Sequence, residues 1–487
     1  MSQLAIVTGH KRPRRLRQGS GISRRIPRMR QFCISGPFRR LLCTAAHLSA
    51  AVPATLCLAS AAVAQEAAVA EVEARPEAVV AATEALPLNR LEAEIAFREL
   101  IGSEDYIAAV AIGERLLALE LAEHGTQSVA TGRALVELGE VQRRAGLLEE
   151  AELSFLNSIE IFRAVEGPFS ENTIEPSIGL GDSYYDDRQF RNAVSAYNEA
   201  RTTQRRAYGL LTEDQLQPMD RMTRAFQAMS MHEEADEQQR AAMLLVERIN
   251  GPSDIETLEA IYRYGSWLRS VYRYEEERIQ YERAIRIIRS EYDKDSLLLV
   301  TPYREIGNSF RSQGFESPRG ASALNSALEL LEERPDTDPV ELAEAIIDVA
   351  DWRTAFGTPG SGHEGYLRAW NLLGSAPDGE NLRRALLRPR RANAVFAMNM
   401  SVRGLAQNPN DSNAVDGRVL VEFDVDPYGR PENATVRESD PPGFKDDAAV
   451  RAVRQSRFRP RIENGQFVFA RRQGYLISFR YIPDDRD

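Results

Sequence analysis

Two short stretches rich in glycine and serine come nearest to catalytic motifs in this chain of 487 residues. Residues 179–183, Gly-Leu-Gly-Asp-Ser, have two glycines of a phosphate-binding loop but neither its third glycine nor its lysine. Residues 360–363, Gly-Ser-Gly-His, hold a serine between glycines, but no strand pattern leads into it as a nucleophile elbow requires. We interpret the first stretch as helix packing and the second as a loop between helices.

Histidine and cysteine, which often serve as metal ligands or bases, are scarce and scattered. All three cysteines precede residue 64, and the histidines beyond it, His124, His232 and His363, have no partner at metal-ligand spacing. We expect these histidines to be solvated surface residues. The sequence therefore predicts a non-enzymatic protein without a cofactor or metal. An enzyme would need titratable groups from distant segments to converge in one pocket.

The first 64 residues have the pattern of a signal peptide. The first forty contain eleven Lys and Arg and no Asp or Glu, and the uncharged stretch 41–64 ends in Ala-Val-Ala. A basic region, an apolar region and small residues before the cleavage site are what export requires. Cleavage would leave a mature chain that begins at Gln65. The alternative is an uncleaved membrane anchor, for which the stretch is long enough.

The net charge of the mature chain indicates which partners it does not bind. Without residues 1–64 the chain keeps its 72 Asp and Glu but loses eleven of its 61 Lys and Arg, which gives a net charge of −22. We therefore expect no nucleic-acid partner. Residues 65–87, rich in Ala, Glu and Val, are expected to form a disordered spacer.

From residue 88 to residue 375 the sequence repeats with a period of 42. Small residues recur on two registers: Gly139, Gly181, Gly265 and Gly307 on the first, and Ala151, Ala193 and Ala235 on the second. Close packing explains this pattern, because small residues let two helices approach and a large ring fills the space beside them. Glu277 stands where alanine is expected, and we assign the three glutamates at 275–277 to a solvated helix face.

The unit that contains Leu135, Leu138, Gly139, Ala151 and Phe155 resembles the tetratricopeptide repeat, in the 42-residue form of kinesin light chains. The resemblance implies a superhelix of helix pairs at 88–375, whose groove holds peptides or partner helices. The alternative is a spacer that only positions the last domain.

An unusually dense aromatic group lies between residues 262 and 281 and includes Trp267 and Tyr274. Core packing is the first interpretation of these rings. The second is a peptide-binding patch, because tyrosine and tryptophan give a large contact area at low entropic cost. Trp267 and Tyr274 are therefore candidate partner-binding residues.

The last seventy residues have the patterns of a small α+β unit. Alternating apolar residues predict strands at 418–426 and 473–481, broken only by Leu420 and Leu476. The turn sequence Asp-Pro-Tyr-Gly at 426–429 leads into a strand at 434–438, and alanines at helical spacing predict a helix at 444–456. We expect a domain at 416–483, after a linker at 376–415 that contains a short basic helix at 382–391.

This order of elements resembles the C-terminal domain of TonB-type energy transducers. The matching residues are Gly417, Asp426, Gly429, Ala448, Ala449, Ala452, Phe458, Pro460, Gly465, Val468 and Phe479. The resemblance implies a periplasmic domain that takes a segment of an outer-membrane transporter as an added strand on the edge of its sheet. The predicted partner-binding residues on that edge are Gln473, Gly474, Tyr475, Leu476, Ile477, Ser478, Phe479, Arg480 and Tyr481.

A basic series runs through the helix of this domain and beyond it, formed by Arg451, Arg454, Arg457, Arg459 and Arg461. We expect a solvated helix face. The alternative is a surface for an acidic partner.

The predicted fold is mainly α, a tetratricopeptide-repeat α-solenoid followed by a small α+β TonB-like domain. The predicted function is a non-enzymatic periplasmic adaptor that binds protein or peptide partners of the cell envelope, in the context of outer-membrane transport. The alternative is a transducer anchored in the inner membrane that couples proton-motive force to TonB-dependent transport. Pairing of two edge strands would also allow a homodimer.

Overall fold

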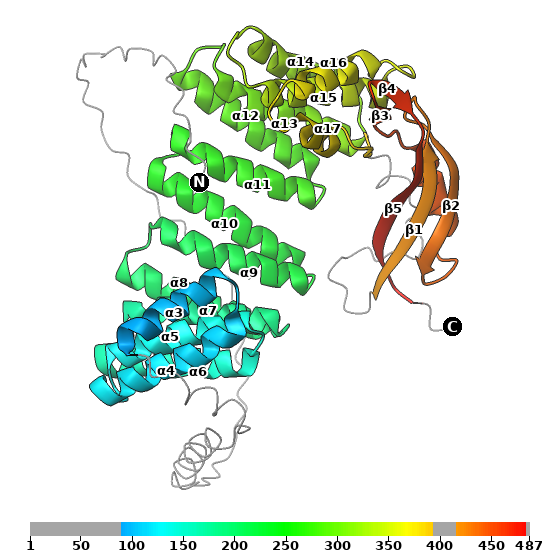
Figure 1. Cartoon of the computed structure of the whole chain (residues 1–487). Coiled ribbons are helices and arrows are strands. Elements are labelled where there is room, and N and C mark those ends of the chain that lie inside the picture. Colours follow the sequence, from blue (N-terminus) through cyan, green and yellow to red (C-terminus); the bar gives the residue numbers. More distant parts are fainter. Residues whose placement is uncertain (1–88, 393–414, 484–487) are drawn as a thin grey trace, which may run out of the picture. The chain divides into compact units, whose positions relative to one another are not determined.

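The computed structural model describes residues 89–392 and 415–483. The first range is helical, and the second holds a small sheet with one helix (Figure 1). The predicted signal peptide and spacer lie outside the described residues, as do residues 393–414 of the predicted linker. The predicted fold class, mainly α with a small α+β domain at the end, is confirmed.

The first described helices belong to a unit that ends at Leu119. They are α3 (Arg90–Gly102) and most of α4 (Tyr106–His124). A capping box starts α3: the side chain of Asn89 accepts a hydrogen bond from the backbone N–H of Glu92, and the Glu92 carboxylate accepts one from the N–H of Asn89. These two bonds satisfy backbone donors that have no partner inside the helix.

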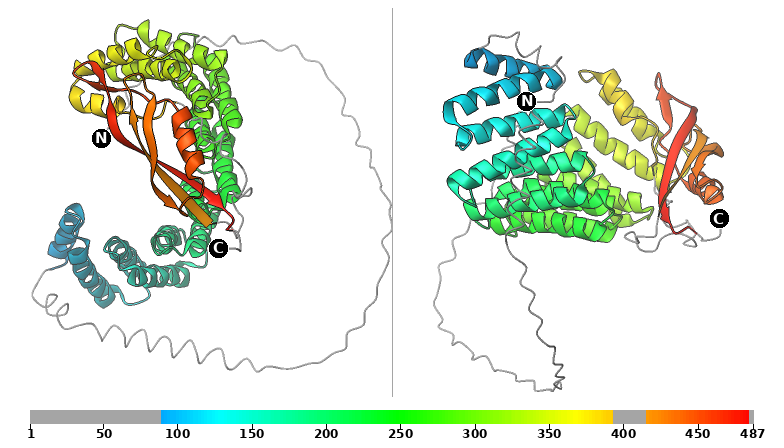
Figure 2. Two further views of the ribbon diagram at one scale, coloured as in Figure 1. Left: turned by 90° about the vertical axis from the view of Figure 1, so that its right-hand side faces the viewer. Right: turned by 90° about the horizontal axis from the view of Figure 1, so that it is seen from below.

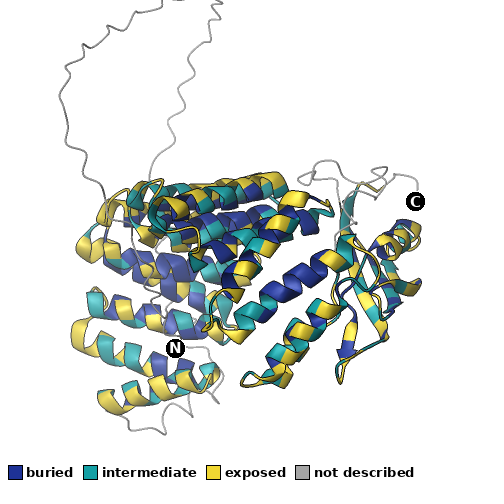
Figure 3. Cartoon of the chain, turned by 90° about the horizontal axis from the view of Figure 1, so that it is seen from above, coloured by how far each residue is buried: buried dark blue, intermediate teal, exposed yellow. Residues whose placement is uncertain are grey.

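Six helix pairs follow between residues 129 and 374. They are α5 (Val129–Arg144) with α6 (Leu148–Glu166), α7 (Ile174–Asp186) with α8 (Phe190–Ala207), α9 (Leu216–Ala228) with α10 (His232–Asn250), α11 (Leu258–Ser270) with α12 (Tyr274–Glu291), α13 (Val300–Gln313) with α14 (Pro318–Glu332), and α15 (Pro339–Phe356) with α16 (His363–Gly374). Each of these helices packs against its partner and against the next helix along the chain (Figure 2). The buried residues are concentrated where packed helices face one another (Figure 3).

The repeated glycines lie at the closest contacts between paired helices. A Cβ atom on Gly139 would lie 2.9 Å from the ring of Phe155, and one on Gly181 would lie 2.4 Å from the ring of Tyr197. A Cβ atom on Gly265 would lie 2.8 Å from the ring of Tyr281. No side chain fits at such distances, so the predicted role of the small residues in helix packing is confirmed.

A second feature of the 42-residue period is the polar residue that begins each pair. Ser128, Ser170, Thr212, Asp254, Ser296 and Asp338 are each 42 positions apart, and the side chain of each accepts a backbone N–H two or three residues later. Such caps are expected where a helix begins, because the first backbone donors lack partners. The sequence analysis did not identify this register.

The C-terminal domain is a three-stranded antiparallel sheet with the order β2-β1-β5. The strands are β1 (Val415–Val425), β2 (Pro431–Asp440) and β5 (Ala470–Tyr481). The helix α19 (Asp446–Gln455) covers one face, where Ala449 and Val453 pack on Val419 and Val421 (Figure 2). A small hairpin of β3 (Arg461–Glu463) and β4 (Gln466–Val468) lies between α19 and β5 in sequence.

The predicted basic helix at 382–391 is displaced toward the N-terminus. The observed helix, α17, spans Gly379–Leu386. Pro389 explains the early end, since the residue before a proline disfavours helical geometry. Residues 390–392 instead pair with 457–459 of the C-terminal domain, through the hydrogen bonds from Ala392 N to Arg457 O and from Arg459 N to Arg390 O.

Within the described ranges, we find no helix that combines the length and the apolar character required to cross a bilayer.

Candidate protein-binding site

The predicted binding strand, β5, is an edge of the sheet. It pairs with β1 without interruption from Tyr481, opposite Val415, to Gln473, opposite Phe423. No other described strand pairs with it. Because alternate residues of an edge strand direct their N–H and C=O groups away from the sheet, part of this backbone has no strand partner among the described residues.

The other edge strand, β2, is less suited to pairing. Its register with β1 shifts twice, after Leu420 and after Glu422. It also carries charges at Glu432, Arg437 and Glu438. Irregular register and charged side chains protect an edge from strand addition, whereas residues 473–479 are regular and uncharged.

Leu420 and Leu476, which break the alternating pattern of their strands, lie directly opposite each other. Leu476 is 55% exposed and Leu420 is half-buried. Ile477, the next residue on β5, is buried in the core under α19. The face of the sheet opposite α19 therefore carries one apolar cross-strand pair.

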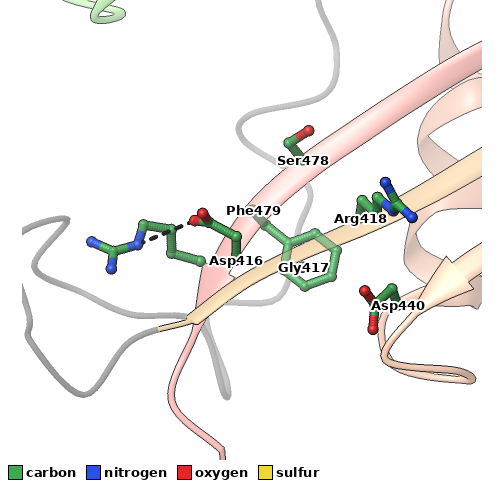
Figure 4. A pocket seen from close by; sticks show the side chains of 7 residues that line it. Asp416, Gly417, Arg418, Asp440, Ser478 and Phe479 are labelled. Carbon is green, nitrogen blue, oxygen red and sulfur yellow. Dashed lines mark ion pairs between the residues drawn. The ribbon is translucent and has the colours of Figure 1, made fainter. Parts of the chain in front are cut away.

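A pocket lies where β1 and β5 meet at the end of the sheet, lined by residues 416–418, 440 and 478–480 (Figure 4). The ring of Phe479 lies over Gly417, where a Cβ atom would approach it to 2.3 Å. Asp416 and Arg480 form an ion pair at 3.4 Å across the two strands. Gly417 and Phe479, two of the residues matched in the sequence, are thus a packing pair.

The turn at 426–429 ties β1 and β2 to the segment after α19. One carboxylate oxygen of Asp426 accepts the backbone N–H of Tyr428 at 2.9 Å and that of Arg430 at 2.7 Å. Gly429 has φ 82°, and its carbonyl accepts the N–H of Phe458 at 2.9 Å. A Cβ atom on Gly429 would lie 2.1 Å from the carbonyl oxygen of Phe458, so only glycine fits.

Arg459 is buried, which corrects the prediction for this one residue of the arginine series, whereas Arg451, Arg454 and Arg461 are exposed as predicted. Its side chain is fully buried and donates two hydrogen bonds to the equally buried carboxylate of Asp351 in α15, at 3.0 and 2.7 Å. Burial by itself would raise the pKa of Asp351, but the charges of Arg459 and Arg311 outweigh it and lower the pKa to about 2. The guanidinium also donates to the carbonyl of Leu386, at the end of α17.

The hairpin of β3 and β4 adds an apolar contact beside this ion pair. Ile462 packs in one cluster with Ile346, Tyr366 and Leu387 of the last helices. The ring of His363 stacks on that of Phe467 with centroids 3.8 Å apart, and its Nε2 lies 2.8 Å from the carbonyl oxygen of Pro427. His363 is therefore a contact residue, and its prediction as a solvated residue is wrong.

Glu277 is also buried, which corrects the prediction for this residue, whereas Glu275 and Glu276 of the same run are exposed as predicted. Its carboxylate accepts hydrogen bonds from Nε of Arg269 at 2.6 Å and from the hydroxyl of Ser309 at 2.7 Å. Burial raises the pKa of Glu277, although the charge of Arg269 partly opposes the shift. The polar side chain at this alanine position is thus accommodated by partners from two other helices.

Trp267 lies inside the helical stack. It is 7% exposed, packs with Tyr264 and Leu268, and donates its indole N–H to Asp236 at 2.9 Å. These contacts explain the position of Trp267 in the core. Its participation in partner binding stays a prediction.

The positive charge of Arg391 acts on both Tyr274 of α12 and Tyr475 of β5. The Arg391 guanidinium carbon lies 4.8 Å from the ring centroid of Tyr475. Burial raises the pKa values of both Tyr274 and Tyr475, and the positive charge of Arg391 opposes both shifts. Tyr272, which is 69% exposed, lies beside Tyr274 with ring centroids 6.3 Å apart. The aromatic group expected at 262–281 includes Tyr272, whereas Arg391 was not expected near β5, because it stands on no repeat or strand register.

No group of three or more His, Cys, Asp or Glu side chains in the described ranges is arranged to hold a metal ion. The arrangement instead offers backbone hydrogen bonds on β5, aromatic rings and arginine. Such groups recognise an extended peptide.

Comparison with protein families gives two matches. Residues 411–483 match the family of the Gram-negative bacterial TonB protein C-terminal domain, and residues 134–206 match the tetratricopeptide repeat. A comparison with curated proteins found no significant match.

Solved structures similar to this chain contain helical repeats. Kinesin light chain TPR-like repeats from Podosopora anserina are 16% identical, with 40% of this chain and 92% of that chain covered and a TM-score of 0.34. BtubC from P. vanneervenii is 13% identical, with 57% and 92% covered and a TM-score of 0.30. The C-terminal part of a TPR repeat-containing protein from Cytophaga hutchinsonii is 11% identical, with 60% and 99% covered and a TM-score of 0.38.

Residues 411–483 thus match the TonB C-terminal family, and residues 134–206, in the helical part of the chain, match the tetratricopeptide repeat.

Proposed function

We propose that this protein is a periplasmic adaptor that binds an extended segment of a cell-envelope partner as an additional strand on β5. The two domain families support a non-catalytic protein-interaction adaptor related to TonB. Periplasmic location, strand addition and a role in outer-membrane transport are the further steps of the proposal. The signal-peptide pattern at 1–64 supports export, and a mature N-terminus at Gln65, measured by intact mass of the native protein, is the expected result.

The observation that carries strand addition is the uninterrupted, uncharged edge from Gln473 to Phe479. Main-chain hydrogen bonds supply the affinity in this binding mode, and side chains on alternate positions supply the specificity. The contrast with β2, whose edge is irregular and charged, supports the choice of β5.

A crosslinking experiment in intact envelopes tests this choice. The predicted mature chain has no cysteine, so Ser478→Cys on β5 and Arg437→Cys on β2 each give one reactive position on an exposed residue. We expect Ser478→Cys to crosslink to a partner and Arg437→Cys to give no such product. The crosslinked partner segment, made as a peptide, should then slow amide exchange of residues 473–481. Equal crosslinking from both positions, or unchanged exchange on β5, would contradict strand addition there.

A further inference from the structure

A polar pocket rich in arginine lies beside Tyr475 of β5, because Arg391, which lines the pocket, contacts the ring of that residue. It lies between the first helices of the last three pairs, α11, α13 and α15, and the end of α17 with the two residues Arg390 and Arg391. Arg269, Arg304 and Arg311, which come from α11 and α13, are called the inner arginines, and Arg390 and Arg391, which follow α17, the outer arginines. Five guanidinium groups therefore surround one cavity.

The three inner arginines have their own acceptors. Arg269 donates to Glu277 and pairs with Glu305. Arg304 donates to Asp348 at 2.7 Å and to Glu344 at 3.0 Å. Arg311 donates to Asn308 and to the carbonyl of Ala392 at 2.8 Å, and lies 3.3 Å from Asp351. These contacts hold the inner wall of the pocket in place.

The two outer arginines are not neutralised in this way. Arg390 lies 3.7 Å from Asp351, a carboxylate whose two oxygens already accept the two hydrogen bonds of Arg459. Arg391 interacts with the Tyr475 side chain but has no carboxylate within ion-pair distance among the described residues, and its Nη1 is buried without a hydrogen-bond partner there. A buried donor without an acceptor is costly, so a ligand that supplies an acceptor at Arg391 gains free energy.

From this geometry we infer that the Arg390–Arg391 mouth of the pocket binds an acidic side chain of the same partner segment that is added to β5. This inference rests on the proposed function. Arg391 contacts Tyr475 on β5, so a strand on the free edge near Tyr475 passes this guanidinium. A carboxylate fits better than a phosphate dianion, because Glu344 and Asp348 in the same lining repel additional negative charge. Arginine also matches a carboxylate with two parallel hydrogen bonds.

The test uses the predicted mature chain and two peptides of alternating valine and threonine that differ only in a central glutamate or glutamine. We expect the glutamate peptide to bind about tenfold more tightly, as a charge-assisted hydrogen bond provides. Arg391→Gln should abolish this preference, whereas Arg388→Gln should retain it. Arg388 is an exposed arginine of the same segment that lies outside the pocket, so the two variants remove the same charge. Equal affinity of the two peptides for the unmodified protein, or a preference that survives Arg391→Gln, would overturn the inference.

Amide exchange of residues 473–481 separates this inference from the proposed function. Equal protection by both peptides with equal affinity supports strand addition and overturns the acidic subsite. If neither peptide protects β5, strand addition of these peptides fails. The pocket is then judged by titration of the Arg391 side-chain N–H signal with the short probe acetyl-Glu-Glu-amide. A saturable shift that acetyl-Gln-Gln-amide does not produce supports the subsite, and the lack of one overturns it.

Discussion

Arg459 and Asp351 are 108 positions apart, yet their side chains form a doubly hydrogen-bonded ion pair from which solvent is excluded. The arginine belongs to the segment after α19, and the aspartate belongs to α15. Tyr366 donates its hydroxyl to the same carboxylate at 2.8 Å. This pair, together with Ile462 and the hairpin, holds the C-terminal domain against the last helix pair.

Replacing Arg459 by methionine should strongly destabilise the contact between the two domains. Removing one partner of a buried ion pair leaves the other charge uncompensated, at a cost of about 3 to 5 kcal/mol. We expect Arg459→Met to lower the urea midpoint. The control, Arg461→Met, removes an exposed pair with Glu463 and should change stability by less than about 0.5 kcal/mol. Similar midpoints for the two variants would contradict the role of Arg459.

Acid should weaken the same contact over a defined range of pH. Because the folded pKa of Asp351 is about 2, below its ordinary value of 3.8, its contribution is present above pH 3.8 and is lost as pH falls toward 2. Urea unfolding at several pH values measures this loss. The double variant Asp351→Leu with Arg459→Met lacks the titrating pair, so its stability should depend less on pH between 3.8 and 2. A curve parallel to that of the unmodified protein would disprove the assignment.

The buried carboxylate of Glu277 should act in the opposite direction. Its folded pKa is raised, so its contribution to stability is present below the unfolded pKa and is lost as pH rises through the folded pKa. Glu277→Gln keeps an acceptor for Ser309 but cannot ionise. The stability of the unmodified protein relative to this variant should therefore fall as pH rises above about 4. Unfolding of both proteins across neutral pH measures the difference, and a constant difference would refute the prediction.

Gly429 and Gly443 offer a matched pair for the turn that joins β1 and β2 to Phe458. Both have φ near 80°, but a Cβ atom on Gly429 would meet the carbonyl of Phe458 at 2.1 Å, while one on Gly443 would meet nothing within 4 Å. Gly443→Ala should lower the free energy of unfolding by about 1 to 2 kcal/mol, because alanine disfavours the left-handed backbone at this position. Gly429→Ala should cost about 3 kcal/mol or more, since the backbone must also move. Equal losses in thermal unfolding would show that the approach of Phe458 does not constrain the turn.

Trp267 and Tyr274 should separate packing from binding. Trp267→Ala removes a buried ring with a hydrogen bond and should cost about 3 to 5 kcal/mol of stability. Tyr274→Ala removes a half-buried ring and should cost about 1 kcal/mol. If Tyr274 contributes to the site, this variant should lose affinity for the crosslinked partner peptide while its melting changes little. Unchanged affinity for that peptide would remove Tyr274 from the site.

The sequence by itself determined most elements of both domains, but not the short strands β3 and β4 or the bounds of α17. A period of two identifies the buried face of a strand, and a period of 42 identifies the contacts of successive helix pairs, because both depend on spacing along the chain. The glycine and alanine registers therefore predicted the contacts at Gly139 and Gly181. The order of elements resembles the TonB C-terminal domain, and this resemblance led us to expect the last strand at an edge of the sheet.

Only the tertiary structure decided which exceptions to these patterns belong together. Leu420 and Leu476 each interrupt a strand pattern, and the fold places them opposite each other. Glu277 and Arg459 carry charges that local spacing assigns to solvent, but the fold supplies Arg269 and Asp351 as partners from other helices. The physical reason is that a charged side chain is buried only where a distant residue compensates it, and no spacing along the sequence records that residue.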